Sequence, residues 1–308
     1  MQIPLLQTKK WQKFQQDLNK TTFFEQNQDF SYLAIVETTS KIGNYLYLPY
    51  GPVAHNLKSF KKALKSLEEL AQAQKCFFIR LEPQNQNFEK YLKTAPNFTK
   101  TKDLNPKDTW TLDLTPDQAT ILTNFSQGTR TRYNQFTKKG LSVTTSKNPA
   151  DIKYLVDLQQ KLAKTKKIGT FSEKYLETEL KQDFATLYLV HFDFKIIAAS
   201  LFFDDDTTRY YMQSAADADF KKLPATVALL STAIFDAKTK GLQNFDFWGI
   251  APENAPKNHP WAGFTEFKKS FGGTAVHYCG TYDLALNHPK YHLYTLLRRL
   301  NRILRKIK

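Results

Sequence analysis

The sequence contains only two cysteines, Cys76 and Cys279, among 308 residues. Each lies in an apolar run, "KCFFIR" or "HYCGTY", so we expect buried free thiols rather than a disulfide or a nucleophile. Free thiols are typical of proteins in a reducing compartment. The first residues, "MQIPLLQTKKWQKF", lack the apolar segment of a signal peptide, and the apolar run "ATVALLSTAIF" is too short to span a bilayer. We therefore expect a cytoplasmic protein.

Signatures of common catalytic sites are missing as well. The chain has no GxSxG elbow, no Walker loop and no GxGxxG motif that opens a helix. The closest histidines, His288 and His292, have no third ligand nearby, which disfavours a zinc site. The acidic run at 204–208, "DDDTT", lies between two strand-like runs and predicts a solvated hairpin turn rather than a metal site. We expect neither a metal nor a cofactor.

Basic residues dominate the charge. The chain has 44 Lys and Arg against 29 Asp and Glu, a net charge of +15. An excess of this size attracts anionic partners, such as nucleic acid, nucleotides or an anionic lipid surface.

Strand and helix patterns recur in both halves of the chain. The first half predicts strands at 31–37, 44–53 and 76–83, with a helix from about Asn56 in which apolar residues recur every three or four positions. The second half predicts strands at 186–192, 195–203, 209–215 and 244–250, with a helix that Pro224 opens and Gly241 closes. A polar helix at 116–140 and two helices at 149–184 lie between them. This order predicts two related α/β units.

Three segments resemble the FemABX family of aminoacyltransferases, which build the peptide bridge of bacterial cell walls. They are "YLPYGPV", "FDFWGI" and "HPWAGFTEFKKSFGGTAVHYCGTYD", and with their spacing they cover nearly the whole chain. The resemblance implies an α/β fold of two tandem GNAT-like (acyl-CoA N-acyltransferase) domains without a long coiled-coil arm. It implies a first domain of residues 1–110 plus 281–308 and a second of residues 111–280. The implied partners are aminoacyl-tRNA and a peptidoglycan precursor, nucleotide-linked or lipid-linked, and we expect a monomer.

Acyl transfer requires stabilisation of the negative charge that develops on the ester carbonyl oxygen, to which one positioned donor contributes ~3 kcal/mol. The family assigns this role to the lysine of a Phe-Lys pair, which matches Phe267 and Lys268. The neighbouring phenylalanines and Gly272-Gly273 would surround that lysine with apolar groups and backbone. The alternative is an amphipathic edge on which Lys268 and Lys269 are both solvated. No residue stands out as a general base.

The resemblance also implies residues that bind the precursor. Lys13 matches a lysine that contacts the diphosphate, although it also fits the polar face of an amphipathic helix. Tyr175 matches a substrate-binding tyrosine, but Phe171 stands where the family has an arginine. Either Lys166 or Lys167 supplies the charge, or the head group of the precursor is held differently in this chain. Tyr50 and Gly51, from "YLPYGPV", are further candidates for substrate binding.

A basic segment matches the part of the family that meets the tRNA. Arg130, Arg132, Lys138 and Lys139 could contact phosphates of the acceptor stem, and the alternative is a solvated helix face.

The tail, residues 290–308, has a helical stripe of leucine and isoleucine opposite a basic face. Such helices lie on anionic membrane surfaces. Packing on the first domain is preferred, because the chain of the family returns to its first domain at the end, and both can hold together. A peripheral location of the protein at the inner face of the membrane is therefore an alternative to a purely cytoplasmic one.

Two other functions remain open. Acyl-CoA-dependent N-acyltransfer is disfavoured because residues 214–226, "SAADADFKKLPAT", contain no glycine for a pyrophosphate-binding turn. A non-catalytic RNA- or membrane-binding relative is the other alternative.

Overall fold

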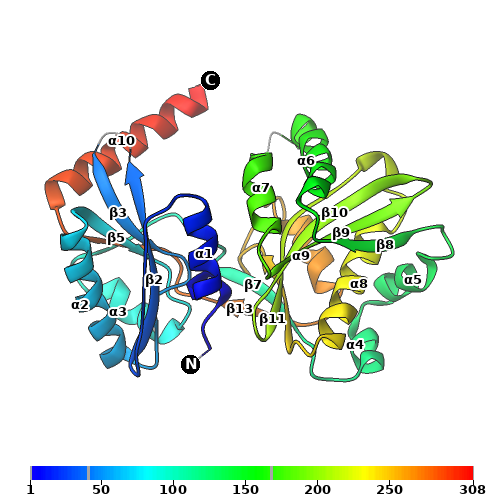
Figure 1. Cartoon of the computed structure of the whole chain (residues 1–308), viewed down its shortest axis with the longest axis horizontal. Coiled ribbons are helices and arrows are strands. Elements are labelled where there is room, and N and C mark those ends of the chain that lie inside the picture. The colour runs from blue at the N-terminus through cyan, green and yellow to red at the C-terminus, as the bar shows by residue number, and fades with distance from the viewer. Residues whose placement is uncertain (1, 40–41, 167–168, 308) are drawn as a thin grey trace. The chain divides into compact units, whose positions relative to one another are not determined.

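The computed structural model describes residues 2–39, 42–166 and 169–307, and the chain divides into two compact units. The first unit comprises Met1–Lys107 and His277–Lys308, and the second comprises Asp108–Val276. The sequence analysis predicted the boundaries between the two domains after residues 110 and 280, close to these positions. Figure 1 shows a β-sheet with helices packed on it in each unit.

The sheet of the first unit has the strand order β1-β2-β3-β5-β14-β6, and β4 pairs with β2. Its strands are β1 (Thr22–Gln26), β2 (Phe30–Thr39), β3 (Gly43–Leu48), β4 (Val53–Ala54), β5 (Cys76–Leu81), β6 (Phe98–Lys100) and β14 (Tyr282–Ala285). Its helices are η1 (Leu5–Gln7), α1 (Lys9–Asp17), α2 (Leu57–Ala73), η2 (Gln86–Phe88), α3 (Glu89–Thr94) and α10 (His288–Ile307).

The apolar run at β5 forms a strand that is buried on both faces. Ile79 lies in the cluster that contains the buried face of α2, whereas Phe78 packs with Tyr291 and Tyr294 of α10. The predicted helix after Asn56 is also confirmed, because the Asn56 side chain accepts a hydrogen bond from the Ser59 N–H at 3.0 Å and caps α2. Both predicted cysteines are buried free thiols.

The predicted strand at 44–53 is interrupted, which corrects the sequence prediction. β3 ends at Leu48, Tyr50 adopts φ +53°, and the Gly51–Pro52 peptide bond is cis. Two prolines in this stretch remove backbone donors, so pairing resumes only in the short strand β4.

The second unit has the strand order β13-β7-β12-β11-β10-β9-β8. Its strands are β7 (Asp108–Asp113), β8 (Ser142–Ser146), β9 (Ala185–Phe192), β10 (Lys195–Asp204), β11 (Thr208–Ala216), β12 (Asn244–Gly249) and β13 (Thr274–His277). Its helices are α4 (Gln118–Asn124), α5 (Gln127–Gln135), η3 (Pro149–Asp151), α6 (Ile152–Lys166), α7 (Glu173–Leu180), η4 (Ala218–Phe220), α8 (Ala225–Thr239) and α9 (Ala262–Lys269).

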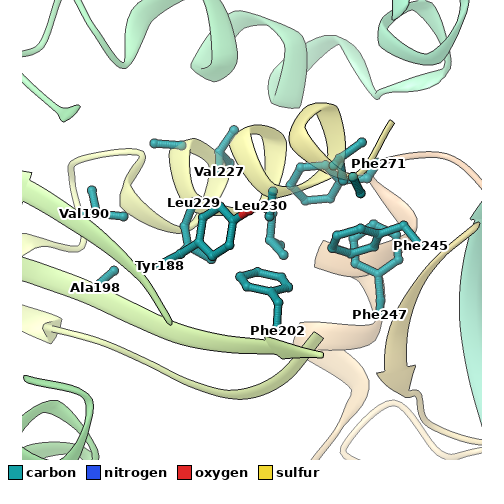
Figure 2. Packing of buried hydrophobic residues seen from close by; sticks show 14 of the residues in the cluster. Tyr188, Val190, Ala198, Phe202, Val227, Leu229, Leu230, Phe245, Phe247 and Phe271 are labelled. Carbon is teal, nitrogen blue, oxygen red and sulfur yellow. The ribbon is translucent and has the colours of Figure 1, made fainter. Parts of the chain in front are cut away.

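Helix α8 forms the centre of the second unit's core. Figure 2 shows Leu230 of this helix among the aromatic side chains of the strands, of which Phe202 and Phe245 are fully buried. Strands β11 and β12 are parallel, and their pairing ends at Tyr210 and Asp246 although β11 continues to Ala216. The two strands therefore separate at this point in the sheet.

Two predictions for the second unit need correction. The single polar helix at 116–140 is two helices, because Phe125 is buried with extended backbone (ψ 143°) and Ser126 caps α5 by accepting from the Thr129 N–H. The acidic run at 204–208 is the predicted turn, but it is not simply solvated. Asp204 accepts hydrogen bonds of 2.7 and 2.6 Å from Arg209, which is fully buried.

Candidate functional site

The segment "GFTEFKKSFGG" forms most of α9 and the turn that follows it. Thr265 and Lys268, three residues apart, are buried on one side of this helix. The Thr265 hydroxyl accepts a hydrogen bond of 2.9 Å from the Ala251 N–H, just after β12. Phe267 packs instead on Phe271, with 5.3 Å between ring centroids. The adjacent residues of the Phe-Lys pair therefore contact different surroundings.

Lys268 is buried at the end of β12. The residue is 7% exposed, and its Nζ donates a hydrogen bond of 2.6 Å to the Gly249 carbonyl oxygen. The rings of Phe264 and Tyr211 lie 5.3 and 5.9 Å from Nζ. Burial lowers the pKa of Lys268 to about 8, and the negative charge of Asp246 opposes this shift. The alternative, in which both lysines are solvated, is wrong for Lys268, whereas Lys269 is exposed as it expects.

Asp246 is a buried carboxylate whose negative charge acts on Lys268, and the sequence analysis missed it. It is 3% exposed, and its carboxylate accepts a hydrogen bond of 2.7 Å from the Trp248 N–H. Burial raises its pKa to about 7, and the Trp248 hydrogen bond and the charge of Lys268 oppose the shift. Trp248 adopts φ +65°, an unfavourable backbone conformation for a tryptophan, directly before Gly249. An aspartate inside the apolar run "NFDFWGI" was the available signal.

This arrangement can stabilise an oxyanion. A lysine ammonium has three N–H donors, and among the described residues the structure assigns one of them to Gly249. The surrounding aromatic rings keep the local dielectric constant low, which strengthens the interaction of a donor with a developing negative charge. Within residues 2–39, 42–166 and 169–307, no group of three or more His, Cys, Asp or Glu side chains could hold a metal ion.

The two glycines after α9 have a steric explanation. Gly272 and Gly273 adopt φ +78° and +98°, and a Cβ on Gly273 would lie 2.2 Å from the Thr111 carbonyl oxygen of β7. The Trp110 Nε1 donates to the Gly272 carbonyl oxygen at 2.7 Å. These contacts fix the C-terminal end of α9 against β7.

Lys13 lies on the polar face of α1. Its side chain is 69% exposed and forms an ion pair of 2.8 Å with Asp17. Trp11 and Phe14 are buried, as the amphipathic pattern predicts. An exposed lysine can meet a diphosphate, so this role stays a prediction.

Tyr50 and Gly51 are buried within the first unit. The Tyr50 hydroxyl donates to the Pro106 carbonyl oxygen at 3.0 Å. A Cβ on Gly51 would lie 2.3 Å from the side chain of Gln7, which is fully buried and donates to the Pro49 carbonyl oxygen at 2.7 Å. Packing accounts for both residues, and their binding of substrate stays a prediction.

Tyr175 stacks on Phe171, with 4.9 Å between ring centroids. Burial and the carboxylate of Glu179 raise the pKa of Tyr175 above its ordinary value. Glu179 is 1% exposed, and Gln213 Nε2 donates to its Oε1 at 3.2 Å. Burial raises the pKa of Glu179 to about 8. Lys167 and the side chain of Lys166, predicted to replace the family arginine, lie outside what the structure describes.

The four basic residues predicted at 130–139 differ in their surroundings. Arg130 donates hydrogen bonds to the carbonyl oxygens of Thr123 and Phe125 and so caps the C-terminal end of α4. Arg132, Lys138 and Lys139 are exposed. The exposed three fit a phosphate-contacting surface better than Arg130 does.

Comparison with known proteins agrees with this architecture. The model of the FemAB family matches residues 2–100 and 159–299. A crystal structure of FemX is similar, with a TM-score of 0.82 at 17% sequence identity over 94% of each chain. The structure of L-PGS from Bacillus licheniformis has a TM-score of 0.60 at 15% identity, over 87% of this chain and 84% of that one. No match occurs among curated proteins.

A tandem GNAT protein from the clavulanic acid biosynthesis pathway is also similar, with a TM-score of 0.52 at 10% identity, over 84% of this chain and 79% of that one. The predicted α/β fold of two GNAT-like units and the resemblance to the FemABX family are both confirmed.

Proposed function

Because the chain belongs to the FemAB family, we propose that it transfers an amino acid from aminoacyl-tRNA to the stem-peptide amine of a peptidoglycan precursor. Family membership gives the general class, a transferase of peptidoglycan bridge formation. The tRNA-linked donor, the nucleotide- or lipid-linked acceptor and action as a monomer in the cytoplasm are parts of the proposal.

The observation that carries the proposal is the buried Lys268, whose Nζ is held 2.6 Å from the Gly249 carbonyl oxygen. In the reaction the acceptor amine attacks the ester carbonyl carbon, and the carbonyl oxygen becomes negatively charged. Lys268 donates a hydrogen bond to that oxygen. As the C–N bond forms and the ester C–O bond breaks, the amine loses a proton and the ribose oxygen gains one. Positioning of the two substrates supplies much of the remaining acceleration.

In this proposal each domain has its own substrate. Residues 1–110 with 281–308 bind the precursor, and Lys13 meets its diphosphate. Residues 111–280 carry out the transfer, with Tyr175 contacting the acceptor and Arg132, Lys138 and Lys139 contacting tRNA phosphates. Exposure of these three basic side chains supports the last assignment.

The test compares Lys268→Met with Lys269→Met, its exposed neighbour on the same helix. Purified protein is given a mixture of charged tRNAs with either UDP-MurNAc-pentapeptide or lipid II, and transfer of radiolabelled amino acid is measured. We expect a loss of ~100-fold or more in kcat for Lys268→Met and less than about threefold for Lys269→Met. Equal activity of the two variants would exclude Lys268 from the reaction. Transfer from acyl-CoA and not from tRNA would replace the proposed donor.

A further inference from the structure

Helix α10 packs on the first unit through tyrosines. Tyr291 and Tyr294 are 6% and 8% exposed, and their rings lie 5.4 and 5.1 Å from the ring of Phe78 on β5. The Tyr291 hydroxyl donates to the Asp283 carboxylate at 2.9 Å, and Arg80 Nη2 donates to the Tyr294 hydroxyl at 3.4 Å. One side of α10 is therefore buried by aromatic and polar contacts.

The leucines of α10 lie on the other side. Leu293, Leu296 and Leu300 are 49%, 53% and 46% exposed, although leucine is usually buried. Their spacing of three and four residues places them on one face of the helix. Leu293 is two residues from Tyr291, about 200° away around the axis. The leucine stripe, which the sequence analysis considered as a surface for packing on the first domain, thus faces away from that domain. In Figure 1 the C-terminal part of α10, in red, extends away from the sheet of its unit.

This apolar face belongs to a segment without acidic residues. No Asp or Glu follows Asp283 in the sequence. Arg299 is exposed beside the leucine face, one position before Leu300, whereas Arg298 lies on the tyrosine side and donates to the Tyr294 hydroxyl at 3.2 Å. The sequence then continues with two arginines and two lysines, Arg302, Arg305, Lys306 and Lys308, and Ile303 and Ile307 continue the apolar spacing.

We propose that α10 binds the surface of an anionic lipid bilayer. Leu293, Leu296 and Leu300 enter the boundary between head groups and acyl chains, and basic side chains that flank them, Arg299 among them, contact lipid phosphates. The helix lies in the plane of the surface, since no helix in the described part of the chain is long and apolar enough to cross a membrane. This inference stands on the exposed face of α10 and does not depend on the proposed transferase reaction.

A second copy of the chain is the competing occupant, because leucines at this spacing also fit the seam of a coiled coil. Charge argues against it. Pairing two copies of α10 would bring two basic segments together without an acidic residue to neutralise either. An anionic bilayer supplies the missing negative charge and also covers the leucines.

The test uses the full chain with sedimented vesicles, either of phosphatidylcholine alone or of phosphatidylcholine with 30% phosphatidylglycerol. The variant Leu293→Gln/Leu296→Gln/Leu300→Gln removes the apolar face and leaves the tyrosine contacts intact. Leu104→Gln is the matched control, since Leu104 is 48% exposed but lies outside α10. We expect the wild type and the control to bind the anionic vesicles at least tenfold more tightly than the triple variant does. High salt should weaken wild-type binding, and neutral vesicles should bind weakly.

Three results would overturn the proposal. They are the absence of wild-type binding to anionic vesicles, equal binding by the triple variant, and a lipid-independent dimer that the triple variant converts to a monomer. Light scattering gives the oligomeric state, and circular dichroism with thermal melting shows that all variants are folded.

Discussion

Arg80 on β5 and Asp283 on β14 form a buried ion pair in which Arg80 Nε and Nη2 each lie 2.7 Å from a carboxylate oxygen. The side chains are 3% and 1% exposed, so neither charge has water as an alternative partner. The pair joins neighbouring strands although its two residues are 203 positions apart in the sequence.

Loss of one partner of this pair should destabilise the first unit strongly. We expect Asp283→Asn or Arg80→Met to lower the free energy of unfolding by about 3–5 kcal/mol, because the remaining group is buried without its partner. Urea denaturation measures the change. The double variant Arg80→Met/Asp283→Leu should be more stable than either single variant, and if it is the least stable of the three, the desolvation argument fails.

Asp246 should set the upper pH limit of transfer. The charge of Asp246 raises the pKa of Lys268, which burial alone would lower further. Asp246→Asn should therefore shift the loss of kcat/KM, expected near pH 8 in the wild type, to lower pH. The profile is measured from pH 6 to 9.5. Glu253→Gln, an exposed acidic residue of the same unit, is the control. An unchanged alkaline limb would show that Asp246 does not tune Lys268.

Glu179 should make stability depend on pH. Its pKa rises from 4.5 to about 8 in the folded protein, so between these values the folded state holds a proton that the unfolded state has released. Raising the pH therefore favours unfolding, by up to about 1.4 kcal/mol per pH unit. Glu179→Gln should gain stability relative to wild type as pH rises from 5.5 to 7.5 in urea denaturation, whereas the exposed Glu173→Gln should not.

Gly273 and Gly263 should respond oppositely to alanine. Gly273→Ala combines φ +98° with a 2.2 Å approach to the Thr111 carbonyl oxygen, and we expect it to cost about 2 kcal/mol or more. Gly263, in the first turn of α9, has nothing within 4 Å of an added Cβ, so Gly263→Ala should be neutral or stabilising by up to about 1 kcal/mol. Thermal unfolding compares the two, and equal effects would remove the steric explanation.

Binding of tRNA should depend on the exposed lysines after α5. Lys138→Gln/Lys139→Gln should weaken tRNA binding and reduce the slope of log K against log salt concentration by about 1–2, as expected for two lost phosphate contacts. Filter binding at several salt concentrations measures this slope. Lys147→Gln is a poor control because Lys147 donates to the Asp183 carbonyl oxygen, so the exposed Lys257→Gln is used. Equal slopes in all proteins would place the tRNA elsewhere.

Local patterns were sufficient for most of the fold. The regular spacing around Phe60 and Leu64 predicted α2, and the continuous apolar run at Cys76 predicted the strand β5. Phe125 shows the limit of such patterns. It fits the periodicity of one long helix, but the core of the second unit takes it up in an extended conformation and the helix is divided there.

Only one of the two charged residues of the candidate site was predicted from the sequence. Lys268 was found through a family pattern, because the adjacent lysines look alike until the fold buries one of them. Asp246 is distant in sequence, and only the packing of α9 against the end of β12 couples its charge to Lys268. For α10 the sequence left two partners open, since an apolar stripe indicates an interaction surface but not its partner.

The position of β14 between β5 and β6 gives the protein an order of assembly. During synthesis, every strand of the second unit leaves the ribosome before β14 does. The second unit can therefore complete its sheet first, while the edge of β5 that later pairs with β14 is still unpaired. A chain that stops after residue 276 should then be protease-resistant only across residues 108–276. The part of the chain that is made first is the last to become a finished domain.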